Sequence, residues 1–143
     1  MAEGGRSPVT RPLPLKVPEQ SLERLISSTK NTLGTAYRSG GASPQGFDCS
    51  GLVIYLYKQH FRMILPRSAQ ELASLGPLVA RSQLQPGDLV FFSIGGERID
   101  HVGISIGHER FVHAANSGVI MSDLLEHYYQ NHYACAARVV TRE

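Results

Sequence analysis

The hexapeptide GFDCSG, residues 46–51, constrains this chain more than any other stretch, because it stands at the entrance to an apolar run. The run CSGLVIYLYKQHF is apolar around most of its circumference, which predicts a helix buried on several sides. Asp48 is then the natural N-cap, and Cys49 lies where free amides and the helix dipole favour a thiolate. Small Ser50 and Gly51 leave space beside the sulfur. These conditions lower a thiol pKa, although a buried packing thiol is the alternative that this stretch alone leaves open.

Two histidines favour a catalytic role for Cys49 over a packing role. His101 opens an apolar strand, and His113 interrupts FVHAA in the next strand. A nucleophilic thiol requires a base, and the base requires a third group that holds its tautomer. The two histidines are twelve positions apart (113 − 101), so an odd hairpin loop or a β-bulge would place them on one face. We expect one of these, with both rings facing the start of the Cys49 helix and His101 nearer the sulfur.

The other titratable candidates receive no catalytic role. Cys135 alternates with its neighbours in ACAARVV and is expected to be a buried small apolar residue. Cys49, His101 and His113 are possible zinc ligands, but no close-spaced ligand pair and no acidic general base accompany them, so neither a metal nor a cofactor is expected. The remaining histidines lie at predicted helix ends or in loops: His60, His108, His127 and His132.

Helices precede strands along the chain. The spacing of apolar residues in 21–33 predicts an amphipathic helix before the Cys49 helix, and a short helix or turn follows Pro66. Strands are predicted at residues 88–92, 101–106, 110–114 and 134–140, with helix or loop at 123–133. This order is typical of an α+β fold in which N-terminal helices pack on a meandering antiparallel sheet.

Composition limits the remaining possibilities. Residues 1–20 contain Gly, Pro and scattered charge without a period, which predicts a flexible arm followed by a single domain over residues 21–143. The net charge is +2 and the Lys and Arg residues are scattered, which disfavours nucleic acid as a partner. The arm lacks the apolar centre of a signal peptide, and no run approaches the ~20 apolar residues of a transmembrane span. A monomer is expected.

Four motifs in order resemble the NlpC/P60 cysteine peptidases, particularly the Spr-type murein endopeptidases of bacteria. They are GTAYRSGGASPQGFDCSGLVIYLY, LPRSAQE, LQPGDLVFF and DHVGISIGHERFVHAA, and the resemblance covers about residues 21–140. It implies a papain-like NlpC/P60 domain that hydrolyses peptide bonds in peptidoglycan stem peptides or cross-links. It also implies a place in the bacterial cell envelope (periplasmic, anchored to the outer membrane or secreted), with this chain the mature part of an exported protein and the arm its tether.

The same resemblance implies a role for individual residues. Cys49 is the nucleophile, His101 the base and His113 the third polar group. The Tyr37 hydroxyl joins the Cys49 N–H in an oxyanion hole, and Asp48 and Ser50 line the substrate groove. The structural alternatives for the last three are a half-buried tyrosine and plain capping residues.

Some questions stay open at this stage. Ser39 stands where relatives commonly carry an aromatic residue, which bears on substrate preference rather than on chemistry. Two other functions compete: a wall-binding module that has lost catalysis, and an acyltransferase of the related lecithin:retinol acyltransferase-like branch. The presence of all three catalytic positions argues against the first, and the order of Cys49 before His101 argues against the second. The bond that is cut, D-alanine to diaminopimelate or D-γ-glutamyl to diaminopimelate, is left open.

Overall fold

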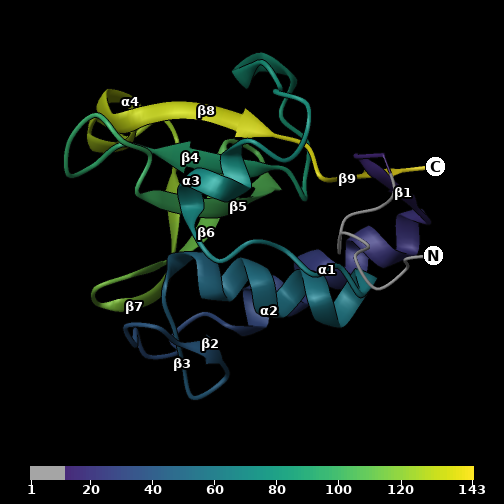
Figure 1. Cartoon of the computed structure of the whole chain (residues 1–143), viewed down its shortest axis with the longest axis horizontal. Helices are drawn as coiled ribbons and strands as arrows, with labels where there is room; N and C mark the ends of the chain where they lie inside the picture. Colours follow the sequence, from purple (N-terminus) through teal and green to yellow (C-terminus); the bar gives the residue numbers. More distant parts are fainter. Residues whose placement is uncertain (1–11) are drawn as a thin grey trace, which may run out of the picture.

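A five-stranded antiparallel sheet and two long helices on one of its faces build the fold (Figure 1). The computed structural model describes residues 12–143. The strands of the sheet follow the order β7-β6-β5-β4-β8, and they are β4 (Leu89–Phe92), β5 (His101–Gly107), β6 (Arg110–Ala115), β7 (Gly118–Asp123) and β8 (Tyr133–Ala137). The helices are α1 (Glu19–Asn31), α2 (Cys49–Phe61), α3 (Ala69–Ala73) and α4 (His127–His132), with a 3₁₀ turn at Arg81–Gln83. The predicted α+β class is confirmed.

Two small sheets complete the architecture. β1 (Leu15–Val17) pairs in parallel with β9 (Val140–Arg142), so that the two ends of the described chain lie side by side (Figure 1). β2 (Ala42–Ser43) and β3 (Gly46–Phe47) form a hairpin just before α2.

The predicted arm over residues 1–20 extends too far along the chain. Ordered structure is already present at β1, and α1 begins two residues earlier than the expected start of the domain at residue 21. A three-residue strand between Pro14 and Pro18 is too short to show a period, and its partner lies at the other end of the sequence. Residues 1–11 lie outside the described part, so the prediction of a flexible arm stays untested there.

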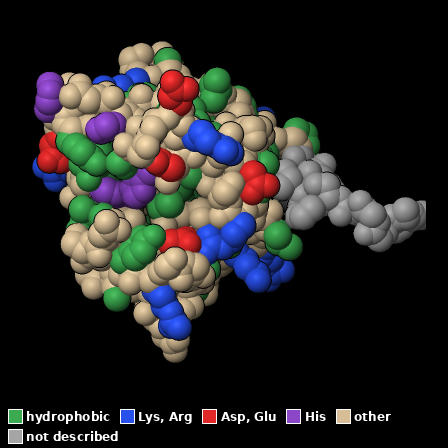
Figure 2. All heavy atoms as spheres, turned by 60° about the vertical axis from the view of Figure 1, so that its left-hand side comes forward, with side chains coloured by type: hydrophobic (Ala, Val, Ile, Leu, Met, Phe, Trp, Pro, Cys, Tyr) green, Lys and Arg blue, Asp and Glu red, His purple; other side chains and the backbone are tan. Residues whose placement is uncertain are grey.

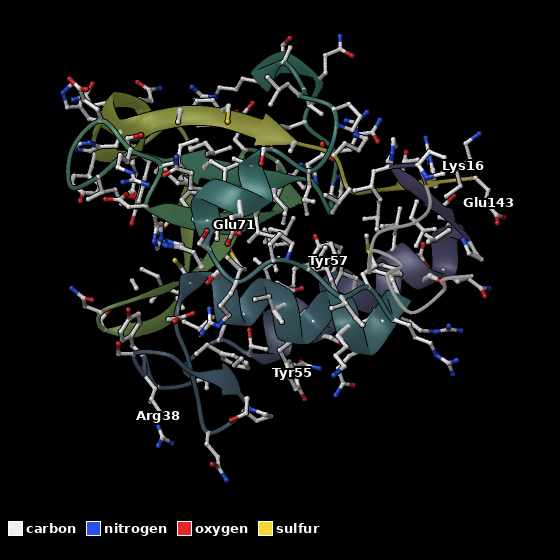
Figure 3. All side chains as sticks on the ribbon, in the orientation of Figure 1. Lys16, Arg38, Tyr55, Tyr57, Glu71 and Glu143 are labelled. Carbon is white, nitrogen blue, oxygen red and sulfur yellow. The ribbon has the colours of Figure 1, made fainter. Side chains whose placement is uncertain are left out.

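Helix α2 is the central element because it packs between α1 and the sheet. Leu52, Val53 and Tyr57 are fully buried, and the Tyr57 hydroxyl donates a hydrogen bond to the Gly87 carbonyl at 2.6 Å. Figure 3 shows Tyr57 on the side of α2 that faces the sheet, whereas Tyr55 points to the opposite side. Within residues 12–143, no helix combines the length and the apolar character needed to cross a bilayer.

The β5–β6 hairpin decides which face carries each histidine. Its turn residues His108 and Glu109 have φ of 56° and 62°, as the right-twisted two-residue turns of hairpins require. A register shift between Ser105 and Gly107 adds one residue to β5. The two-residue turn alone would separate the faces of His101 and His113, and the bulge restores the match. The bulge alternative predicted from the sequence is therefore confirmed.

Gly51 should tolerate no side chain, because a Cβ at this position would overlap the carbonyl oxygen of Gly41. We expect Gly51→Ala to lower the free energy of unfolding by about 3 kcal/mol, since overpacking forces the backbone of the loop away from the helix. Gly96→Ala is the matched control, because a Cβ there meets nothing within 4 Å. Urea unfolding of both variants measures the difference, and equal stabilities would contradict the close approach.

Candidate active site

One cavity of about 310 Å³ brings the three predicted catalytic side chains together. Cys49 comes from the start of α2, His101 from the start of β5 and His113 from the middle of β6. Tyr37, in the loop before β2, also lines the cavity, with Tyr128 and Tyr129 from α4. Figure 2 shows histidine side chains gathered among hydrophobic ones on this face of the molecule. Residues far apart in the sequence therefore share one recess.

Cys49 stands at the first position of α2, as predicted. The Asp48 side chain accepts the N-cap hydrogen bond from the Gly51 N–H at 2.7 Å. The thiol sulfur lies 3.9 Å from the carbonyl oxygen of Asp100, the residue that precedes His101. The thiol therefore faces the strand that carries the predicted base.

The expected lowering of the thiol pKa is wrong for this geometry. Burial raises the pKa of Cys49, and the nearby Asp48 carboxylate raises it further. Hydrogen bonds from backbone N–H groups, chiefly that of Val102, only partly oppose these effects. The helix terminus favours the thiolate, but the loss of solvation outweighs it, so the thiol is neutral at neutral pH.

The two imidazoles form a hydrogen-bonded pair. Nε2 of His101 lies 2.8 Å from Nδ1 of His113, and Nε2 of His113 lies 2.8 Å from the Ser122 hydroxyl. Burial lowers the pKa of His101 to about 4, against a smaller opposing effect of Asp100. Burial, followed by the charge of His101, lowers the pKa of His113 to about 3. Both rings are therefore neutral at neutral pH.

Ser122 was not predicted as a site residue, because its strand, β7, was not predicted from the sequence. The segment GVIMSD has only three apolar residues in a row after Gly118 and no strict alternation, so its pattern gave no strand signal. The structure pairs it with β6 along its whole length, with Ile120 opposite His113. Ser122 lies two residues further along and reaches the imidazole from there.

Asp48 and Ser50 take part in a polar cluster with Arg67. The Arg67 guanidinium lies 2.9 Å from Asp48 Oδ2 and 2.6 Å from Ser50 Oγ, and the Ser50 hydroxyl donates to the Arg67 carbonyl at 2.7 Å. Partial burial opposes ionisation of Asp48, but the hydrogen bonds from Arg67 and Gly51 outweigh it and lower its pKa. Arg67 lies in the motif LPRSAQE, where no local pattern indicates its contact with Asp48.

A second hollow of about 570 Å³ adjoins the catalytic cavity, and Asp100 lines both. It runs between the start of α3 and the loop from β4 to β5, with Gln70 and Arg98 in its wall. The Asp100 carboxylate accepts hydrogen bonds from the N–H groups of Ile94 and Gly95 at 2.8 and 2.7 Å, which fixes this loop at the rim.

In residues 12–143, no group of three or more His, Cys, Asp or Glu side chains is arranged to hold a metal ion. The cavity itself is lined by the Cys49 thiol and by the imidazoles of His101 and His113.

A family model described as the NlpC/P60 family matches residues 34–138. The match contains the loop with Tyr37, the Cys49 helix, both histidine strands and β7. The chain therefore belongs to the NlpC/P60 family.

Particular relatives agree with this placement. The chain is 42% identical over 120 residues to murein DD-endopeptidase MepS/murein LD-carboxypeptidase of Escherichia coli, covering 83% of this chain and 63% of that protein. It is 44% identical over 115 residues to murein DD-endopeptidase MepH of Escherichia coli, covering 76% of this chain and 42% of that protein. The chain thus spans less than two thirds of the length of these two relatives.

Solved structures show the same fold. An NlpC/P60 family protein from Bacillus cereus superposes with a TM-score of 0.78 at 34% identity, over 84% of this chain and 40% of that one. The NlpC/P60 domain of the peptidoglycan hydrolase SagA superposes with a TM-score of 0.70 at 28% identity, over 81% of this chain and 97% of that domain. The expected NlpC/P60 fold is confirmed.

The buried imidazole pair should make stability depend on pH. An unfolded histidine takes up a proton near pH 6.5, whereas His113 in the folded chain does so only near pH 3, so stability falls as pH falls between these values. One such histidine lowers the free energy of unfolding by about 2 kcal/mol between pH 7 and pH 5. We expect His113→Asn to lose less stability than the wild type over this interval, as measured by urea unfolding at both pH values. Equal losses would contradict a buried neutral His113.

Proposed function

We propose that this chain is a cysteine endopeptidase that hydrolyses peptide bonds in the stem peptides or cross-links of peptidoglycan. The observation that carries the proposal is the 2.8 Å hydrogen bond between His101 and His113 in the cavity that also contains the Cys49 thiol. A nucleophile, a base and a group that orients the base are the minimum set for covalent acyl transfer. Membership of the NlpC/P60 family, together with relatives named as murein endopeptidases, supports this substrate class.

Proton transfer accompanies attack in this mechanism, because both the thiol and the base are neutral at rest. Nε2 of His101 is engaged by His113, which leaves Nδ1 to receive the proton of the Cys49 thiol. The sulfur then attacks the scissile carbonyl carbon and forms a tetrahedral intermediate. Ion-pair formation in a buried site is costly unless it coincides with bond formation, so the base acts in the transition state rather than before it.

The negative charge on the carbonyl oxygen needs donors at the start of α2. The backbone N–H of Cys49 lies at the helix N-terminus, where the dipole also favours an anion. Tyr37 lines the same cavity and its hydroxyl supplies the second donor. His101 then returns its proton to the leaving amine, and a water molecule, activated by the same ring, releases the acyl group from the sulfur.

The two hollows on this face offer room for an extended peptide around an internal bond. Asp100 lines both the catalytic cavity and the second hollow, so a substrate bound at Cys49 has space beyond this residue. Asp48 and Ser50 flank the nucleophile but line neither hollow, and their polar groups bind Arg67, which favours a role in holding the start of α2 over contact with substrate. By similarity to MepS and MepH, the D-alanine to diaminopimelate cross-link is the first bond to test, and the D-γ-glutamyl to diaminopimelate bond is the second. Such a substrate supports a location in the bacterial cell envelope.

The choice of Cys49 as nucleophile is tested by comparing the two cysteines. Cys49→Ala should abolish hydrolysis of purified muropeptides, followed by mass spectrometry of the products, while thermal unfolding changes little. Cys135→Ala is the control and should keep full activity, because Cys135 lies on β8 away from the cavity. Cys135 is only half-buried, not buried as predicted from the sequence, so its loss of stability should be small.

The product masses also identify the bond that is cut, since the two candidate bonds leave different fragments. Hydrolysis that persists in Cys49→Ala would refute the assignment of Cys49 as the nucleophile. A wild-type protein that binds muropeptides and releases no fragment would instead support a wall-binding module without catalysis.

The two histidines should differ in their effect on turnover. His101→Ala should reduce kcat by more than His113→Ala, because the first removes the base, which contributes about 10²–10⁴-fold, and the second only its orientation. In the wild type, kcat/KM should fall as pH decreases through about 4, where His101 takes up a proton. Steady-state rates on a fluorogenic stem peptide from pH 3.5 to 8 measure both effects. A larger loss of kcat in His113→Ala than in His101→Ala would indicate that His113 is the base and His101 the orienting group.

A further inference from the structure

The hydrogen-bonded chain of the site does not end at His113. Ser122 contributes a hydroxyl that is 2.8 Å from His113 Nε2, and both side chains are almost inaccessible to solvent, at 9% and 1% exposure. Ser122 lies on β7, which is bound to β6 by register pairs along the whole strand. The hydroxyl is therefore held in place by the sheet rather than by a mobile loop.

The two distances allow only two consistent arrangements of protons, since each neutral imidazole carries one N–H. In the first, His101 Nε2–H donates to His113 Nδ1, and His113 Nε2–H donates to the Ser122 oxygen. In the second, the Ser122 hydroxyl donates to His113 Nε2, His113 Nδ1–H donates to His101 Nε2, and His101 carries its proton on Nδ1. Only the first arrangement leaves Nδ1 of His101 with a free lone pair for the thiol proton.

We propose that Ser122 is a positioning residue that accepts a hydrogen bond from His113 Nε2–H and thereby holds His101 in the tautomer that can act as base. This inference rests on the proposed function, in which His101 receives the proton of Cys49. Ser122 touches neither the sulfur nor the scissile bond in this scheme and acts through His113. The relay thus has four members, from Cys49 through both imidazoles to the serine.

The surroundings of His113 make the serine oxygen important. The ring of Phe111 lies 4.5 Å from that of His113, and the ring of Tyr129 lies 5.4 Å from it, centroid to centroid. The hydrogen bond between His113 Nε2 and Ser122 is itself buried, so a lost acceptor there is not simply replaced by solvent. Without the Ser122 oxygen, a buried Nε2–H would have no partner, and the proton would move to Nδ1 to avoid this. That change reverses the donor and acceptor roles between the two rings.

Three variants separate positioning from packing. Ser122→Ala removes the acceptor, and Ser122→Thr keeps a hydroxyl on the same strand. Ser105→Ala is the matched control, because it removes a buried hydroxyl, at 3% exposure, from β5, which pairs with the other side of β6. We expect Ser122→Ala to lower kcat about fivefold, the effect of losing one hydrogen bond of ordinary strength, with KM unchanged. Ser122→Thr should recover most of this loss, and Ser105→Ala should keep the wild-type kcat.

The tautomer is read directly from the protein labelled with ¹⁵N-histidine, because protonated and unprotonated ring nitrogens differ widely in their chemical shifts. In the wild type at pH 7, His113 should be protonated on Nε2 and unprotonated on Nδ1. Ser122→Ala should shift the proton toward Nδ1, and Ser105→Ala should leave it in place.

Three results would overturn the inference. They are a wild-type His113 protonated on Nδ1, a Ser122→Ala variant with unchanged kcat, or a lowered kcat without any change of tautomer. A wild-type protein without muropeptide hydrolysis would refute the proposed function instead, and the spectra would still decide whether Ser122 sets the tautomer.

Discussion

The hydrogen bond from the Gly51 N–H to the Asp48 carboxylate fixes where α2 begins, and with it the position of Cys49. The same carboxylate accepts a second hydrogen bond from the Gly40 N–H at 3.1 Å, and the Asp48 N–H donates to the Gly41 carbonyl at 2.9 Å. Loop and helix are thus joined through one residue. The absence of a side chain at Gly51 lets the Gly41 carbonyl approach the first turn of the helix.

The sheet supplies the other half of the site under a different constraint. The bulge in β5 places both imidazoles on one face, and the aromatic side chains of Phe92, Phe111 and Tyr129 surround them. This apolar environment depresses the pKa of both histidines, while burial raises the pKa of the thiol. The site is therefore a set of neutral groups linked by hydrogen bonds. The positions of its protons depend on the tautomers of the two imidazoles, and the thiol and the imidazoles form no ion pair at rest.

Local and long-range effects on the thiol act in opposite directions. The helix start, with its cap and small neighbours, could be predicted from GFDCSG and was confirmed, because caps depend on residues within one turn. The sign of the pKa shift at Cys49 could not be predicted from the sequence, because desolvation depends on how closely β5 and its neighbours cover the sulfur. The predicted burial of Cys135 was wrong for a similar reason. The alternation along β8 was apparent from the sequence, but the exposure of each face depends on what packs against it.

The sequence by itself determined the elements whose signals are local. It specified the two long helices, the three central strands, the N-cap at Asp48 and the three residues Cys49, His101 and His113 that meet in one cavity. Tertiary structure decided what depends on contacts between distant segments. It paired β1 with β9, chose the bulge over an odd loop, added β7 with Ser122, and joined Arg67 to Asp48. The division has one physical cause: helix and turn preferences arise within a few residues, whereas burial and strand pairing are properties of the whole packed chain.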